Sequence, residues 1–243
     1  MRINKFISET GVCSRREADA WIEAGRVAIN GERAALGSKI EVGDHVTVDG
    51  KPVGPRKSVV YIALHKPVGI TCTTEREVPD NIIDYIGYPE RIFPIGRLDK
   101  NSEGLILLTN DGDVVNEILR AEHAHEKEYI VTVDRPVTPE FLEQMQQGVE
   151  LLETRTRPCL ANRVAKHVFR IVLTQGLNRQ IRRMCEALAY RVMRLRRIRI
   201  MHITLDDLEA GEWRDLTEEE LRELHSRCGS SPRRGTSPSG SST

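Results

Sequence analysis

The sequence predicts an α+β protein with a small N-terminal module and a larger domain on a mixed, mainly antiparallel sheet. Apolar runs of strand length alternate irregularly with few helical patterns, and a Pro- and Gly-rich polar segment follows residue 50. The chain has 243 residues, enough for one large domain and one small one, with a core of useful size.

Residues 1–50 are predicted to form the small module. Residues 3–7 have helical spacing, and residues 14–17 have the form of a capping box, so two helices are expected. Asn30-Gly31 then predicts a hairpin because both turn residues tolerate positive φ. Residues 42–50 alternate like a further strand that ends in a turn.

The rest of the chain divides into three parts. Residues 51–57 are predicted as a linker and 58–225 as the larger domain, and residues 226–243 form a basic tail without acids that we expect to be disordered. The first half of the larger domain is predicted to contain a strand at 59–64, a loop at 71–88, a strand at 105–108, a helix at 113–120 and a strand from Lys127. The second half is predicted to contain a helix at 138–148, strands at 151–161 and 168–173, a helix capped by Asn178 and a strand at 192–205. A strand at Trp213 and a helix capped by Thr217 follow.

Composition excludes several classes of protein. The 39% hydrophobic and 30% charged residues are typical of a globular protein. The sequence has neither an apolar run of about 18 residues nor a signal-peptide pattern, so we expect no membrane segment and a cytoplasmic location. The five cysteines are scattered without a C-x-x-C pair, and His123 and His125 have no evident third ligand, so neither a disulfide framework nor a metal site is expected.

Charge is distributed unevenly although the net charge is zero. Residues 176–200 hold eight arginines against Glu186, and residues 201–225 hold nine acids against two arginines. A basic segment of this kind is typical of a surface that binds RNA. The alternative is that the two segments neutralise each other.

Residues 96–112 contain the most informative pattern in the chain. Asp99 lies in a Gly- and Ser-containing loop just before an apolar run that is predicted to be a buried strand. Its carboxylate must be exposed or paired, because burying an unpaired charge costs on the order of several kcal/mol or more. Without its surroundings, Asp99 would be read as a solvated acid.

Gly-Arg-Leu-Asp-x-x-Ser-x-Gly-Leu-x-x-Leu-Thr-Asn-Asp-Gly at 96–112 resembles the active-site signature of the ribosomal RNA pseudouridine synthases that carry an N-terminal S4-like RNA-binding module. Ser-Arg-Arg-Glu-Ala at 14–18 and Val-x-Ile-Asn-Gly at 27–31 resemble the S4 module itself. The stretches 125–134, 175–186 and 211–217 are similar to the F-type synthases of the large ribosomal subunit. The resemblance spans residues 2–225.

The resemblance implies three catalytic residues. Asp99 would be the essential carboxylate, and Tyr129 in the motif Lys127-x-Tyr129 would stack on the target base. Arg182, in the third motif at 178–184, would pair with Asp99 and fix its direction. From local sequence alone, Tyr129 would be a strand aromatic that fills the core.

Nine basic residues are expected to contact RNA. Arg15 and Arg16 oppose the dipole of the helix that they begin, which phosphates would compensate. Lys66 lies in a Lys-Pro-x-Gly segment that resembles the entry to the family's catalytic domain. For Arg15, Arg16 and Lys66 the alternative is an ordinary surface side chain whose charge is solvated by water. The full set is Arg15, Arg16, Lys66, Arg97, Lys127, Arg179, Arg183, Arg194 and Arg196.

The implied activity is isomerisation of a uridine to pseudouridine within RNA, by base flipping and without a cofactor or metal. We expect a monomer whose substrate is a stem-loop of 23S ribosomal RNA, with a transfer RNA anticodon stem-loop as a candidate second substrate. Two alternatives stay open. One is a non-catalytic S4-type RNA-binding protein that acts in ribosome assembly, and the other is a nucleosidase or ribonuclease.

Overall fold

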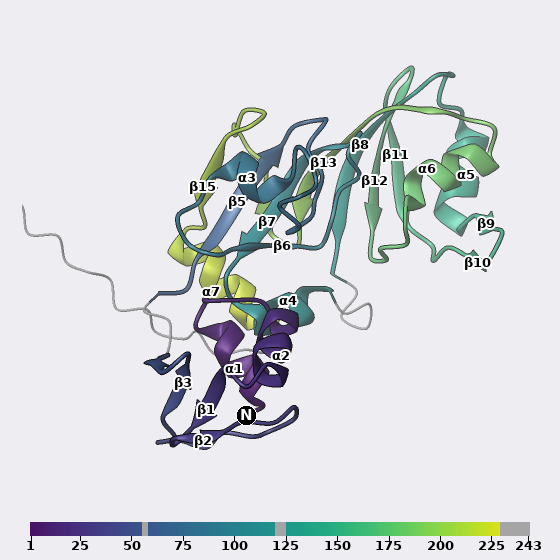
Figure 1. Ribbon diagram of the computed structural model, residues 1–243. Coiled ribbons are helices and arrows are strands. Elements are labelled where there is room, and N and C mark those ends of the chain that lie inside the picture. Colours follow the sequence, from purple (N-terminus) through teal and green to yellow (C-terminus); the bar gives the residue numbers. More distant parts are fainter. Residues whose placement is uncertain (55–57, 120–124, 229–243) are drawn as a thin grey trace, which may run out of the picture.

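The computed structural model describes residues 1–54, 58–119 and 125–228, and it shows a small N-terminal module beside a larger sheet domain (Figure 1). The module consists of α1 (Ile3–Glu9), α2 (Arg15–Glu23), β1 (Val27–Ile29), β2 (Glu32–Arg33), β3 (Val46–Val48) and β4 (Lys51–Pro52). The four strands form one antiparallel sheet in the order β2-β1-β3-β4.

A local signal places the second helix of this module. The Ser14 hydroxyl accepts from the Glu17 amide, and the Glu17 carboxylate accepts from the Ser14 amide, so the predicted capping box begins α2. Ile3, Ile7 and Ile22 are buried in a separate core together with the strands. The predicted linker begins too early, because Lys51 and Pro52 pair with β3.

The larger domain begins with β5 and ends with α7. Its elements are β5 (Tyr61–Lys66), α3 (Ile82–Ile86), β6 (Phe93–Ile95), β7 (Glu103–Thr109), α4 (Gly112–Leu119), β8 (Lys127–Val133), α5 (Pro139–Gln147), β9 (Glu150–Leu151), β10 (Thr154–Arg155), β11 (Leu160–Ala165), β12 (Val168–Leu173), α6 (Gln180–Ala187), β13 (Val192–Ile200), β14 (Ile203–Thr204), β15 (Trp213–Asp215) and α7 (Glu218–Arg227).

Nine strands of the described chain form the central sheet, with the order β11-β12-β8-β13-β7-β5-β15 and with β14 and β6 paired to β13 and β7. Within this described sheet only β13 and β7 pair in parallel, and the other pairs are antiparallel. The predicted mixed, mainly antiparallel α+β fold is therefore confirmed.

Helices cover the sheet unequally. On one face α3, α5 and α6 contribute Ile82, Phe141 and Met184 to the main core, and on the other face α4 and α7 contribute Val114 and Leu224 to a second core. The alternating apolar side chains of β7 supply both cores, which is why all seven of its residues are buried. In Figure 1, α5 and α6 lie at the end of the sheet away from the N-terminal module.

The module contacts the larger domain through α1 and α4. The Lys5 ammonium lies 2.6 Å from the Asp113 carboxylate, in the first turn of α4. The Asp113 carboxylate raises the pKa of Lys5, which hydrogen bonds to it. This ion pair joins the two parts of the chain directly.

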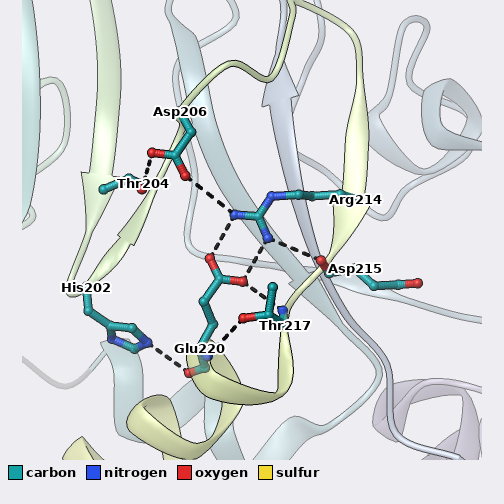
Figure 2. A network of polar contacts seen from close by, with 7 residues as sticks. All are labelled: His202, Thr204, Asp206, Arg214, Asp215, Thr217 and Glu220. Carbon is teal, nitrogen blue, oxygen red and sulfur yellow. Dashed lines mark hydrogen bonds and ion pairs between the residues drawn. The ribbon is translucent and has the colours of Figure 1, made fainter.

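A network of polar contacts holds α7 against β14 and β15 (Figure 2). Arg214 donates from both terminal nitrogens to Glu220, at 2.7 and 2.8 Å, and the amide of Thr217 donates to the same carboxylate. His202 contacts the Glu220 carbonyl oxygen at 2.8 Å. The predicted Thr217 cap is thus one part of a larger clamp between a strand and a helix.

Three predicted boundaries differ from the structure. The expected loop at 71–88 contains α3, which is capped by Asn81 and closed by a left-handed Gly87. The expected strand at 192–205 is the hairpin of β13 and β14, which turns at Met201 with φ of 55°. The larger domain extends beyond residue 225 because α7 runs to Arg227.

Several predictions fall on residues 55–57, 120–124 and 229–243, which lie outside the described part of the chain. These are the end of the linker, the end of the helix predicted at 113–120, His123 and most of the basic tail. No helix within the described ranges is long and apolar enough to cross a membrane.

Candidate active site

Asp99 lies in a tight turn between β6 and β7 that is held from both sides. The Ser102 amide donates to the Asp99 carbonyl oxygen at 3.0 Å and closes the turn. The Leu98 amide contacts Cys72 Sγ at 3.4 Å, and the Gly69 amide donates to the Lys100 carbonyl oxygen at 2.8 Å. The backbone around Asp99 is therefore fixed, while 32% of its side chain remains exposed.

Lys66 is buried and holds the turn that follows β5. Its ammonium donates to the carbonyl oxygens of Pro67 and Ile70, both at 2.8 Å, and the residue is 0% exposed. Burial lowers the pKa of Lys66. The turn after β5 folds over its side chain and supplies the acceptors, which counts against the prediction that Lys66 contacts RNA.

Arg182 lies next to Asp99, as the resemblance implied. Its Nε is 3.5 Å from Asp99 Oδ2, and its Nη2 donates to the Asn101 carbonyl oxygen at 2.9 Å and to Ser102 Oγ at 3.0 Å. Arg179 is also close, with Nη1 3.8 Å from the same carboxylate oxygen. Two guanidinium groups from the start of α6 thus face one aspartate.

The beginning of α6 differs from the sequence prediction. Asn178 is not the cap: the helix begins at Gln180, and the cap position is Arg179 in a left-handed conformation with φ of 49°. Gln180 stabilises the preceding loop, since its side-chain oxygen accepts from the Leu177 amide at 3.0 Å. A non-glycine residue with positive φ is uncommon and often lies at a functional site.

Tyr129 is brought to the site by strand register. Across the sheet, Lys66 pairs with Gly104, Gly104 with Arg197, and Arg197 with Tyr129. Gly104 has φ of 112°, and a Cβ there would lie 2.2 Å from the Arg197 carbonyl oxygen. Only glycine therefore allows β13 to approach β7 closely enough to complete this row.

Asp99, Tyr129 and Arg182 line one cavity of about 90 Å³ between the turn and α6. Its polar lining also includes Arg97, Ser102 and Arg179, and its apolar lining comes from Leu98, Leu173, Leu177, Ile181 and Leu195. Tyr129 is only 9% exposed and packs with the main core. The cavity presents an aromatic ring, a carboxylate and guanidinium groups to whatever enters it.

The chain is similar to known proteins over most of its length. The family model for RNA pseudouridylate synthase matches residues 60–187, and the S4 domain model matches residues 1–46. The dual-specificity RNA pseudouridine synthase RluF of Salmonella typhi is 57% identical over 225 residues, covering 92% of this chain and 78% of that protein. The chain belongs to the RNA pseudouridylate synthase family.

Further relatives support the same assignment. Ribosomal large subunit pseudouridine synthase B of Bacillus subtilis is 33% identical over 232 residues, covering 92% of this chain and 95% of that protein. A solved pseudouridylate synthase matches with a TM-score of 0.68 and 31% identity, over 92% of this chain and 99% of that one. The chain is thus an RNA pseudouridine synthase, an isomerase with an S4 domain, and the alternative of a non-catalytic binding protein gains no support.

The structure separates the basic residues of this synthase into groups. Arg97 and Arg179 are exposed and line the cavity, and Arg15 and Arg16 are exposed at the beginning of α2 in the S4 domain. Arg183 is half-buried on α6. Lys127 is also half-buried, where burial lowers its pKa and its ammonium donates to the His125 carbonyl oxygen at 3.3 Å.

Arg194 and Arg196 lie on the other face of the sheet from the cavity. They alternate along β13 with Leu195, which lines the cavity. Arg194 donates to Glu103 at 2.5 Å, at the edge of that opposite face. Neither arginine lines the cavity, and their contact with RNA stays a prediction.

The basic and acidic segments are not each other's partners in the ion pairs found among the described residues. The basic segment pairs with Asp99, Glu103, Glu126 and Glu128, and all four precede residue 176. In the acidic segment, Arg214 pairs with Asp206 and Glu220. These pairs count against mutual neutralisation.

Sequence reasoning gave no role to Ser102, although the motif contains it. Ser102 is 1% exposed and contacts Arg182 through its hydroxyl. The available signal was its spacing of three from Asp99, which permits the turn that brings both side chains to one place. Gly104 had a similar signal, since a glycine inside a strand often marks a close backbone approach.

Proposed function

We propose that this synthase isomerises a specific uridine in 23S ribosomal RNA, with Asp99 as the reacting carboxylate. The observation that carries the proposal is the Asp99–Arg182 contact of 3.5 Å in a cavity that Tyr129 also lines. The substrate class is supported by the relative in Bacillus subtilis, whose name assigns it to the large ribosomal subunit.

The reaction breaks the N1–C1′ bond, turns the uracil, forms a C5–C1′ bond and releases the C5 proton. Product and substrate have the same atoms, and the C5 proton is matched by one gained at N1. The isomerisation therefore needs no oxidant, reductant or co-substrate, and we propose that it proceeds without a cofactor or metal.

Each of the three residues has a role that its position supports. Asp99 would attack C1′ or the base, or remove the ribose 2′ proton, since its partly exposed side chain lines the cavity. Tyr129 would stack on the flipped base, a contact worth roughly 1 to 3 kcal/mol. Arg182 would keep the Asp99 carboxylate oriented, because its guanidinium group is charged and planar.

RNA contacts follow from the exposed cations. Arg97 and Arg179 at the cavity would bind phosphates beside the flipped nucleotide, and Arg15 and Arg16 would bind the backbone at the S4 domain. Lys127 and Arg183 are half-buried, so they would bind only RNA groups that lie close to the protein surface. We propose a monomer that acts in the cytoplasm, where ribosomal RNA is modified.

A transfer RNA anticodon stem-loop is proposed as a second substrate. The relative in Salmonella typhi is named a dual-specificity RNA pseudouridine synthase. Sequence-specific RNA recognition is directed mostly at loops and bulges, so one local shape that recurs in two RNAs would serve both.

The test is tritium release from RNA labelled at uracil C5, with wild type and Asp99→Ala, on 23S ribosomal and transfer RNA transcripts. Release by wild type alone, followed by mapping of the site, is the expected result. Free uracil would identify a nucleosidase and cleaved RNA a ribonuclease. Intact binding without release from either RNA would leave an RNA-binding protein.

A further inference from the structure

Arg182 can direct Asp99 only if its own guanidinium group is held in place. Its Nε lies 3.5 Å from Asp99 Oδ2, which is too far for a strong hydrogen bond. That Nε is buried, and within the described residues it has no hydrogen-bond acceptor. The contact with Asp99 is therefore too weak to fix the orientation of Arg182.

The opposite end of the guanidinium group is held firmly. Nη2 donates to Ser102 Oγ at 3.0 Å and to the Asn101 carbonyl oxygen at 2.9 Å. Nη1 makes only a long contact of 3.5 Å with the Val192 carbonyl oxygen. Because guanidinium is planar and rigid, fixing Nη2 also fixes the direction of Nε.

Ser102 belongs to the same turn as Asp99. The Ser102 amide closes that turn by donating to the Asp99 carbonyl oxygen at 3.0 Å, and its side chain is 1% exposed. One short segment thus carries the carboxylate and also holds the arginine that faces it. Any displacement of the turn moves both groups together.

We propose that Ser102 is a positioning residue of the synthase reaction, which acts by holding Arg182 so that Nε stays directed at Asp99. This inference rests on the proposed roles of Asp99 and Arg182. Ser102 does not need to touch the substrate. Loss of its hydroxyl would leave Nη2 with one acceptor, the Asn101 carbonyl oxygen, and Arg182 freer to rotate away from Asp99.

The experiment measures kcat and KM by tritium release with Ser102→Ala, Ser102→Thr and the control Thr156→Val. Thr156 is 2% exposed and its hydroxyl accepts from the Val149 amide at 2.9 Å, so the control removes a buried hydroxyl that does not line the cavity. We expect Ser102→Ala to lower kcat about 10- to 100-fold with KM changed less than about threefold. Ser102→Thr should recover most of kcat, and Thr156→Val should keep it.

A double-mutant cycle with Arg182→Met separates positioning from other roles. If Ser102 acts through Arg182, adding Ser102→Ala to Arg182→Met lowers kcat no further. An equal loss in both backgrounds, a change in KM alone, or a kcat within twofold of wild type for Ser102→Ala would overturn the inference. Because the cycle compares rates between folded variants, it remains decisive if Ser102→Thr does not fold.

Failure of the proposed function would be visible separately. In that case wild type would release no tritium, or Asp99→Ala would release as much as wild type. Active wild type, inactive Asp99→Ala and additive losses in the cycle would leave the proposed function intact and remove Ser102 from it.

Discussion

Two arginine–carboxylate pairs in the larger domain are built in opposite ways. Arg214 and Glu220 meet through two hydrogen bonds of 2.7 and 2.8 Å, and the Thr217 amide donates to the same carboxylate (Figure 2). Arg182 and Asp99 meet at 3.5 Å, with the arginine held by Ser102 and Asn101. The first pair satisfies its carboxylate, and the second leaves its carboxylate open to the cavity.

The difference shows that an arginine–carboxylate pair can either stabilise the fold or present a reactive carboxylate. A carboxylate that accepts several short hydrogen bonds is stabilised where it is, and it holds α7 on the strands. A carboxylate whose partner is fixed by other groups keeps its direction, and its oxygens remain available to a substrate. Substitutions in the two pairs test whether one pair affects stability and the other affects turnover.

Of the two arginine substitutions, the one that removes the cation at the cavity should have the larger effect. Arg182→Met should lower kcat about 100-fold or more, because a preorganised charge at the reacting group is lost. The free energy of unfolding should fall by only about 1 kcal/mol, since few short hydrogen bonds are broken. Tritium release and urea unfolding measure the two quantities. A large loss of stability with normal turnover would make this pair structural.

Arg214→Met is the counterpart at the clamp. It should lower the free energy of unfolding by about 2 kcal/mol, because Glu220 loses two hydrogen bonds in a site where it is mostly buried. The fluorescence of the neighbouring Trp213 reports the unfolding transition if Trp21, the other tryptophan of the chain, is replaced by Phe. We expect kcat within about twofold of the parent, and a loss of turnover in the folded variant would contradict the separation.

The smallest effect concerns pH. The Arg214 hydrogen bond holds the pKa of Glu220 below its ordinary value of 4.5. The folded chain therefore binds fewer protons than the unfolded chain at that site. Its contribution is fully present above 4.5 and is lost as pH falls through the folded pKa. The stability difference between wild type and Glu220→Gln should shrink in that acidic window, by about 1 kcal/mol or less. A constant difference at all pH values would show that Arg214 does not act through this carboxylate.

Much of the fold could be predicted because its signals are local. The capping boxes at Ser14 and Thr217 need only residues three apart, and both helices begin where these signals place them. Thr138 and Pro139 likewise begin α5. The apolar run after Asp99 is a buried strand, as its composition indicated.

What could not be predicted depends on the three-dimensional path of the chain. Lys66 looked like a surface cation, because only the folded turn brings the nearby carbonyl oxygens of Pro67 and Ile70 to its ammonium. Asn178 is a better cap than Arg179 by residue type, but the packed loop before α6 places Arg179 in the cap position. Alternation with Leu195 could have grouped Arg194 with Arg196, yet only the folded sheet shows which face bears the cavity.

The candidate site divides in the same way. The motifs located Asp99 and Arg182, and the structure brings them together although they are 83 positions apart in the sequence. Their chemical roles, and that of Tyr129, stay predictions until activity is measured. Ser102 was within the motif, but its contact with Arg182 could be found only from the folded geometry.

The most direct test exchanges the two carboxylates for amides in parallel, as Asp99→Asn and Glu220→Gln, and measures turnover and unfolding for both. We predict that Asp99→Asn loses turnover by about 10⁴-fold and changes the free energy of unfolding by less than about 1 kcal/mol. Glu220→Gln should keep turnover within about twofold and lose about 1 kcal/mol of stability. If Asp99→Asn still releases tritium at the wild-type rate, Asp99 is not the reacting carboxylate and the account is contradicted.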